Sequence, residues 1–161
     1  MKTILITGGV RGIGRSIALH FQQKNYRVCA VYSRDEENAS TLAKLGVEVY
    51  KADVCKEEEV VSLFEKIGRV DVLVNNAGVS LIKQIQDISY AEYQKVMSVN
   101  MGGAFLCSRE AAKGMIDKKS GLIVNISSVL YFLKYFFQHR SFVHFYPYAF
   151  HIEPYIPDVC R

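Results

Sequence analysis

Residues 7–14 read Thr-Gly-Gly-Val-Arg-Gly-Ile-Gly and continue directly from the short apolar run Ile4–Thr7. The run predicts a β-strand. Behind it Ile13, Ile17 and Phe21 recur every four residues, which predicts a helix whose apolar stripe packs on a sheet. A glycine-rich turn between a strand and a helix is typical of a phosphate-binding loop, because unpaired N–H groups at the helix start attract an anion. The alternative is a glycine-rich turn without a ligand.

The glycines of this stretch have separate expected roles. Gly8 permits the tight turn, Gly12 lets the backbone approach a pyrophosphate, and Gly14 lets the helix pack closely on the strand. The stretch therefore predicts a set of residues around the pyrophosphate of a dinucleotide: Thr7, Gly8, Arg11, Gly12, Ile13 and Gly14.

Beyond this stretch, short apolar runs alternate with helical stretches, which is the pattern of βαβ units. The predicted further strands are Arg27–Tyr32, Val47–Tyr50, Asp71–Asn75 and Gly121–Ile126, and the predicted helices are Lys56–Ile67 and a long one around Ala91–Lys118. The sequence therefore predicts an α/β fold of the Rossmann type, a three-layer sandwich. Its parallel sheet is expected in the order 3-2-1-4-5, with helices on both faces.

The spacing Thr-Gly-x-x-x-Gly-x-Gly resembles the short-chain dehydrogenase/reductase family, and landmarks in the family's order extend the resemblance over residues 1–128. Asp53-Val54 resembles the pair that contacts adenine, and Asn75-Asn76-Ala77-Gly78 the signature that closes the fourth strand. Asn100 falls where the family has the helix asparagine of its catalytic tetrad. Gly121–Ser128 resembles the fifth strand, which ends on a substrate-facing serine. The resemblance implies cofactor contacts at Asp53, Val54, Asn75, Ala77 and Gly78, and catalytic residues at Asn100 and Ser128.

Within that family the sequence is most similar to bacterial β-ketoacyl-[acyl-carrier-protein] reductase-like proteins. The resemblance implies NADPH-dependent reduction of a ketone to an alcohol, with a 3-oxoacyl thioester or a similar small carbonyl compound as substrate. Ser128 would polarise the carbonyl, and Asn100 would hold a water in the proton relay. Family members are usually homo-oligomers. The competing hypothesis is a nucleotide-binding remnant without catalysis.

The residues after the second strand bear on the choice of cofactor. An acidic residue closing that strand would accept hydrogen bonds from the free 2′-hydroxyl of NAD and would repel a 2′-phosphate. Here Ser33 and Arg34 follow the strand, and a hydroxyl and a guanidinium suit a phosphate. In NADP-dependent members of the family that the sequence resembles, an arginine inside the glycine loop, here Arg11, points to the same 2′-phosphate region. Asp35 argues for NAD, and the alternative for both arginines is a solvated surface position. NADP is favoured over NAD.

Composition changes after Ser128. Residues 129–161 hold eleven of the nineteen Phe and Tyr residues and none of the eleven glycines. No Tyr-x-x-x-Lys occurs in the chain, although the family uses that tyrosine to transfer the substrate proton and that lysine to lower its pKa. We expect residues 1–128 to form the dinucleotide-binding domain and residues 129–161 to be an aromatic-rich tail, left by a reading frame shifted or cut near residue 129. A divergent tail that caps the sheet is an alternative, and a tail that binds a membrane or partner is another.

Charge and cysteine content narrow the remaining classes. The net charge is +4 without a Lys/Arg block, so nucleic acid is not an expected partner. The four cysteines lack metal-ligand spacing, which favours free thiols in a reducing compartment and no metal site. No run reaches the ~18 apolar residues of a membrane span, and the first apolar run is too short for a signal peptide. The sequence predicts a cytoplasmic protein without a membrane partner.

Overall fold

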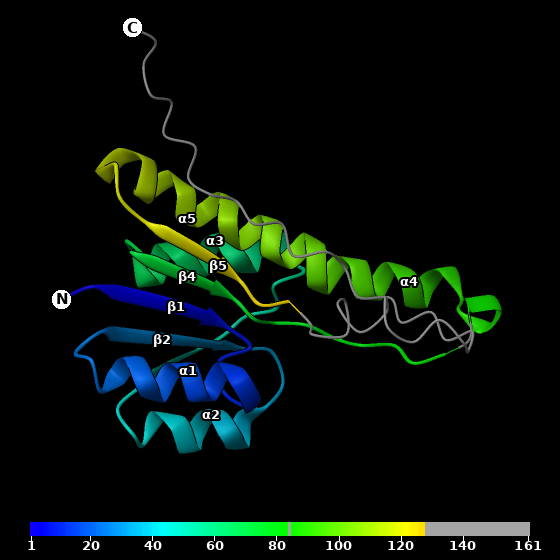
Figure 1. Ribbon diagram of the computed structural model, residues 1–161, viewed down its shortest axis with the longest axis horizontal. Coiled ribbons are helices and arrows are strands. Elements are labelled where there is room, and N and C mark those ends of the chain that lie inside the picture. The colour runs from blue at the N-terminus through cyan, green and yellow to red at the C-terminus, as the bar shows by residue number, and fades with distance from the viewer. Residues whose placement is uncertain (84, 128–161) are drawn as a thin grey trace, which may run out of the picture.

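The computed structural model describes residues 1–83 and 85–127. In this part of the chain, five parallel strands form one sheet in the order β3-β2-β1-β4-β5, with α1 and α2 on one face and α3 and α5 on the other (Figure 1). The strands are β1 Thr3–Thr7, β2 Arg27–Tyr32, β3 Glu48–Lys51, β4 Val72–Asn75 and β5 Leu122–Asn125. The helices are α1 Gly12–Gln22, α2 Glu36–Ala43, α3 Glu57–Ile67, α4 Tyr90–Met97 and α5 Ala104–Lys118, with a short 3-10 turn η1 at Ile85–Asp87. The predicted Rossmann-type fold and strand order are confirmed.

The central strand β1 is buried on both sides. Ile4, Leu5 and Ile6 are each 0% exposed, and successive side chains of a strand point to opposite faces. Leu5 packs in the core beneath α3 and α5, whereas Ile4 and Ile6 pack in the core beneath α1 and α2. Burial on both faces explains why β1 reads as a continuous apolar run rather than an alternating one.

The predicted stripe of α1 is wrong in its first member. Ile13 is 62% exposed, and Ile17 and Phe21 are only partly buried. The fully buried helix residues are Gly14 and Ala18. Because Gly14 has no side chain and Ala18 has only a methyl group, the helix backbone lies close to the sheet and the larger residues lie on the flank of the contact.

Two helical features differ from the sequence prediction. The sequence did not indicate α2, which has only Ala39 and Leu42 as buried residues and therefore a weak apolar period. The long helix expected around Ala91–Lys118 runs from Tyr90 to Lys118 but contains a π-helical segment, η2, at Ser98–Gly103. Backbone angles at Gly103 and Ala104 remain helical, so α4, η2 and α5 form one continuous rod.

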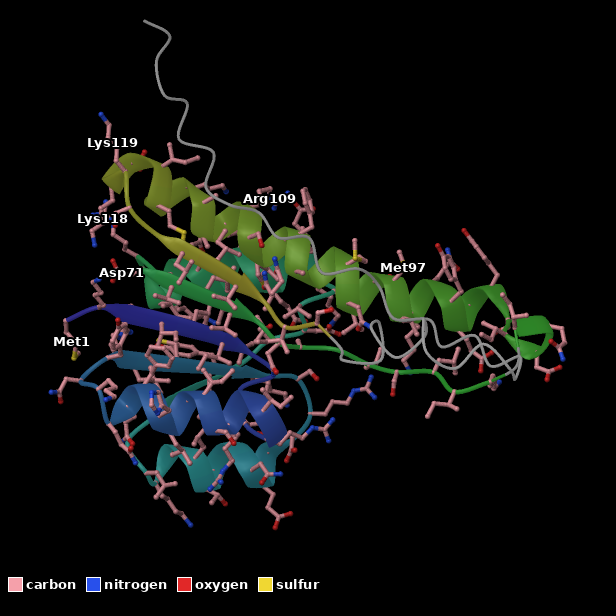
Figure 2. All side chains as sticks on the ribbon, in the orientation of Figure 1. Met1, Asp71, Met97, Arg109, Lys118 and Lys119 are labelled. Atoms are coloured by element: carbon pink, nitrogen blue, oxygen red, sulfur yellow. The ribbon has the colours of Figure 1, made fainter. Side chains whose placement is uncertain are left out.

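The sheet differs between the side at which its parallel strands begin, called the amino edge here, and the side at which they end, called the carboxyl edge. At the amino edge Asp71 accepts a hydrogen bond of 2.8 Å from the Thr3 N–H and pairs with Lys118 at the end of α5, so β1, β4 and α5 are joined there (Figure 2). At the carboxyl edge the rod continues past the strands toward Met97 and α4 (Figures 1 and 2). All five strands end at this second edge, and the predicted cofactor-binding residues lie at or after the ends of β1, β2, β3 and β4 there.

Ser128 and residues 129–161 lie outside the described residues, and so do the three expectations for the tail. Within residues 1–83 and 85–127, no helix is long and apolar enough to cross a membrane.

Candidate functional site

The glycine-rich turn joins β1 to α1 at the carboxyl edge of the sheet. Gly8 and Gly12 have positive φ angles of 62° and 53°, in a region that side chains with a Cβ rarely adopt. The Gly9 N–H donates to the Val31 carbonyl at 3.0 Å, which ties the turn to β2. A Cβ added to Gly14 would lie 2.6 Å from Asn76 Nδ2 and closer still to the Gly8 carbonyl oxygen. The first turn of α1 is therefore pressed against the loop that precedes it.

The start of α1 has no side-chain cap. Its N-cap residue, Arg11, is extended and makes no capping hydrogen bond, and the first turn contains no acidic residue. By contrast, Asp35 caps α2, and Ser89 caps α4 in a reciprocal capping box. Gly12 is exposed, and a Cβ there would meet nothing within 4 Å. Since the first N–H groups of a helix need partners and attract anions, this end of α1 can receive a phosphate.

Thr7 and Asn76 lock the turn after β1 onto the loop after β4. The Thr7 hydroxyl accepts hydrogen bonds of 3.0 Å from the N–H groups of both Asn76 and Ala77. The Asn76 side-chain amide donates at 3.0 Å to the carbonyls of Thr7 and Gly8. Thr7 is 2% exposed, whereas Asn76 and Ala77 are half-buried. Sequence reasoning gave Asn76 no role of its own; its signal was a doubly donating amide directly after a strand that neighbours β1.

The side chain of Asn75 points to the α5 side of the sheet. Its amide donates to Asn125 Oδ1 at 2.9 Å and to Ser108 Oγ at 3.0 Å. Its own oxygen is buried, with no hydrogen-bond partner in the described part of the chain. The side chain thus joins β4, β5 and α5.

Asn100, in η2, is bound to the loop after Gly78. Its Oδ1 accepts from the Val79 N–H at 2.8 Å, and its Nδ2 donates to the Val79 carbonyl at 2.9 Å. A Cβ on Gly78 would lie 3.5 Å from Asn100 Oδ1. The structure therefore brings Asn75, Ala77, Gly78 and Asn100 together at one end of β4. An asparagine amide keeps one N–H and one lone pair after two such bonds, which is what remains of the Asn100 side chain for a water.

A second group of predicted residues follows β2. Ser33 and Arg34 are exposed there, as is Arg11. The Asp35 carboxylate accepts from the backbone and side-chain N–H groups of Asn38 at 3.0–3.2 Å. These bonds lower the pKa of Asp35, and nearby Arg11 lowers it further. Asp35 is therefore engaged as the N-cap of α2, close to Arg11.

Asp53 and Val54 form a closed turn after β3. The Asp53 N–H donates to Glu59 Oε2 at 2.8 Å, and Asp53 Oδ1 accepts from the Cys55 N–H at 3.0 Å. Val54 is 7% exposed. Burial raises the pKa of the Cys55 thiol to about 11 and that of Cys107 to about 12, so neither offers a thiolate at neutral pH.

Neither the hollow beside α1 nor any metal-binding cluster of the described residues extends the candidate site. A hollow of about 580 Å³ runs along α1 and is lined by Gly12, Ile13, Ser16, Ile17, His20 and Phe21. Only Gly12 and Ile13 of that lining belong to the predicted site. Among the described residues no group of three or more His, Cys, Asp or Glu side chains could hold a metal ion.

The chain is similar to known proteins both in sequence and in fold. The short chain dehydrogenase family matches residues 2–139, which extends past Ser128. A 3-oxoacyl-[acyl-carrier-protein] reductase of Staphylococcus aureus is 34% identical over 139 residues, covering 80% of this chain and 56% of its own length. A short-chain type dehydrogenase/reductase of Picea abies is 38% identical over 147 residues, covering 80% of this chain and 54% of its own length.

A solved structure described as a short chain dehydrogenase/reductase family protein superposes with a TM-score of 0.75 at 31% identity. The match covers 80% of this chain and 55% of that one. The chain thus spans about half the length of the relatives that it matches.

Proposed function

The chain belongs to the short-chain dehydrogenase family, and from that premise we propose that its carboxyl edge binds a nicotinamide dinucleotide and that its lineage reduces carbonyl compounds. The observation that supports this best is the uncapped start of α1 above the open glycine turn. The pyrophosphate of the dinucleotide would lie against Gly8, Arg11, Gly12, Ile13 and Gly14, where the helix N–H groups face it.

The proposed contacts elsewhere follow from the loops after β3 and β4. Asp53 and Val54 would contact the adenine, and the backbone from Asn75 to Gly78 would line the inner ribose. Thr7 would act indirectly, because its hydroxyl is already used to hold the N–H groups of Asn76 and Ala77.

We propose NADP rather than NAD as the cofactor. Exposed Arg34 and Ser33, with Arg11 nearby, would bind the 2′-phosphate by charge-assisted hydrogen bonds. The acidic residue that argued for NAD, Asp35, is occupied with Asn38 at the start of α2. Its engagement supports the proposal, because a carboxylate committed to a cap is less available to a ribose hydroxyl.

Replacing Arg34 with Asp is expected to weaken NADPH binding at least tenfold, because a hydrogen bond to a charged group contributes about 1.5–3 kcal/mol. NADH binding should be weakened less or become tighter. Calorimetric titration of both dinucleotides measures the change. Arg69→Asp is the matched control, since Arg69 is exposed before β4 at the amino edge and the variant should bind as the wild type does. Equal wild-type affinities for NADPH and NADH that Arg34→Asp leaves unchanged would remove the NADP assignment.

The proposed reaction of the lineage is reduction of a 3-oxoacyl thioester or a similar small carbonyl compound to the alcohol. The reduced dinucleotide, when bound, supplies a hydride to the carbonyl carbon. Ser128, which lies outside the described residues, would polarise the carbonyl oxygen. Asn100 would position a water with the hydrogen-bonding capacity that its pairing with Val79 leaves.

A second candidate function is nucleotide binding without catalysis. The observation that favours it is the absence of Tyr-x-x-x-Lys from all 161 residues. In the family that lysine lowers the pKa of the tyrosine that protonates the developing alkoxide, and an unperturbed tyrosine has a pKa of about 10.

We expect the chain to bind NADPH but not to catalyse the reduction of a carbonyl substrate. Oxidation of NADPH in the presence of an acetoacetyl thioester should stay at the background rate, while titration shows saturable binding. A rate of roughly 1 s⁻¹ or more, typical of enzymes, would refute the non-catalytic candidate. Loss of that rate in Ser128→Ala would then assign the reductase function to this chain.

A further inference from the structure

The π-helical segment η2 touches the loops that follow two different strands. Asn100 is bonded to Val79 in the loop after β4. Three residues later, Gly103 lies against Val54 in the turn after β3. Since β3 and β4 lie on opposite sides of β1 in the sheet, η2 contacts both halves of the proposed dinucleotide site.

The contact between Gly103 and Val54 leaves no room for a side chain. A Cβ on Gly103 would lie 2.6 Å from Val54 Cγ2 and 3.0 Å from Val54 Cβ. Gly103 is helical, with φ −61°, so glycine is needed here for close approach and not for backbone freedom. Gly103 and Val54 are both buried, so neither can relax toward solvent.

Movement of Val54 would be transmitted to its turn. Hydrogen bonds fix Asp53 through Glu59 and Cys55, and the Lys56 N–H donates to the Asp53 carbonyl at 3.0 Å where α3 begins. The turn is therefore a rigid unit with Val54 at its centre. A displacement of Val54 moves the unit and does not stay within one rotamer.

We propose that Gly103 is a positioning residue for the adenine end of the dinucleotide site. By having no side chain, it lets η2 seat Val54 and thereby sets the position of the Asp53–Val54 turn that would contact adenine. This inference rests on the proposed function, and it adds a residue that is buried behind the site and touches no ligand.

The neighbouring glycine provides a matched control. A Cβ on Gly102 would meet only the Met97 carbonyl oxygen, at 3.9 Å, which is ordinary van der Waals contact. Gly102→Ala and Gly103→Ala therefore make the same chemical change in the same π-helical segment. Only the second pushes on Val54.

The test measures binding of adenosine 2′,5′-bisphosphate, which has the adenine end of NADP and no nicotinamide. Gly103→Ala is expected to weaken binding at least about tenfold, while Gly102→Ala stays near the wild type. The Val54 methyl resonances should shift in Gly103→Ala alone. Because the nicotinamide end is untouched, NADPH should lose affinity by the same factor as the bisphosphate.

A double-mutant cycle shows whether Gly103 acts through Val54. Val54→Ala removes the Cγ2 atom that the new Cβ would strike, so the double variant should bind better than the product of the two single losses, by at least roughly twofold. In the wild type, a nuclear Overhauser effect should connect the Val54 methyls with the Gly103 Hα, a readout that survives if Gly103→Ala fails to fold.

Three results would overturn the inference: equal binding by the two alanine variants, fold losses that simply multiply in the cycle, or no Overhauser effect in the wild type. Failure of the wild-type chain to bind either ligand would instead refute the proposed dinucleotide site, and the adenine role of Gly103 with it. The two failures are therefore distinguishable.

Discussion

Replacing Gly14 with alanine is expected to abolish detectable dinucleotide binding and to lower the free energy of unfolding by about 1–3 kcal/mol, the usual cost of overpacking. The new Cβ would lie 2.6 Å from Asn76 Nδ2 and closer still to the Gly8 carbonyl oxygen. Neither atom can yield cheaply, because Asn76 is bonded to both Thr7 and Gly8. The start of α1 would have to move away from the turn, and the N–H groups that we propose bind the pyrophosphate would move with it.

Gly114→Ala is the control for this variant. Gly114 lies inside α5, and a Cβ there would meet only Arg69 Cγ at 3.7 Å and Arg69 Nε at 4.0 Å. Alanine should therefore stabilise the protein by about 0.5–1 kcal/mol through helix propensity and leave binding unchanged. Denaturant unfolding and NADPH titration measure both quantities. Binding by Gly14→Ala at wild-type affinity would contradict the proposed place of the pyrophosphate.

Replacing Thr7 with valine is expected to have the second large effect. Valine keeps the shape of threonine but removes the oxygen that accepts from the N–H groups of Asn76 and Ala77. A fully buried N–H left without a partner costs about 1–3 kcal/mol. These two N–H groups are only part-buried, so the variant should lower the free energy of unfolding by about 2–4 kcal/mol, the lower part of twice that cost. The loop after β4 would also lose its attachment to β1, and NADPH affinity should fall with it.

Thr7→Ser separates the hydroxyl from the methyl group. Serine keeps the acceptor and loses one methyl, which should cost about 1 kcal/mol of burial and leave NADPH affinity near that of the wild type. Chemical denaturation and titration of the three proteins give the comparison. Equal stability of the serine and valine variants would mean that the hydroxyl does not hold the loop after β4.

The sequence by itself determined the fold and indicated where a candidate site lies. Apolar runs such as Ile4–Thr7 and Asp71–Asn75 appear as strands because a parallel sheet buries both faces, and the glycines after β1 indicate a turn because positive φ favours glycine. The structure confirmed the parallel sheet and its order, whereas α2 and the π-helical segment η2 were not predicted. The confirmed features depend on neighbouring residues or on the spacing of apolar residues, so each can be predicted from one segment of the sequence.

Tertiary structure decided what each side chain does. Nothing in the sequence shows that the Asn75 amide turns toward Ser108 and Asn125, or that Ile13 is exposed while Gly14 is buried. The steric role of Gly103 is likewise invisible until Val54, forty-nine positions earlier, is placed against it. Such contacts join residues that are distant in sequence, and their geometry depends on how closely whole helices approach the sheet. Period and propensity therefore predict the elements and the edge at which they meet, whereas the hydrogen bonds and close approaches at that edge follow only from packing.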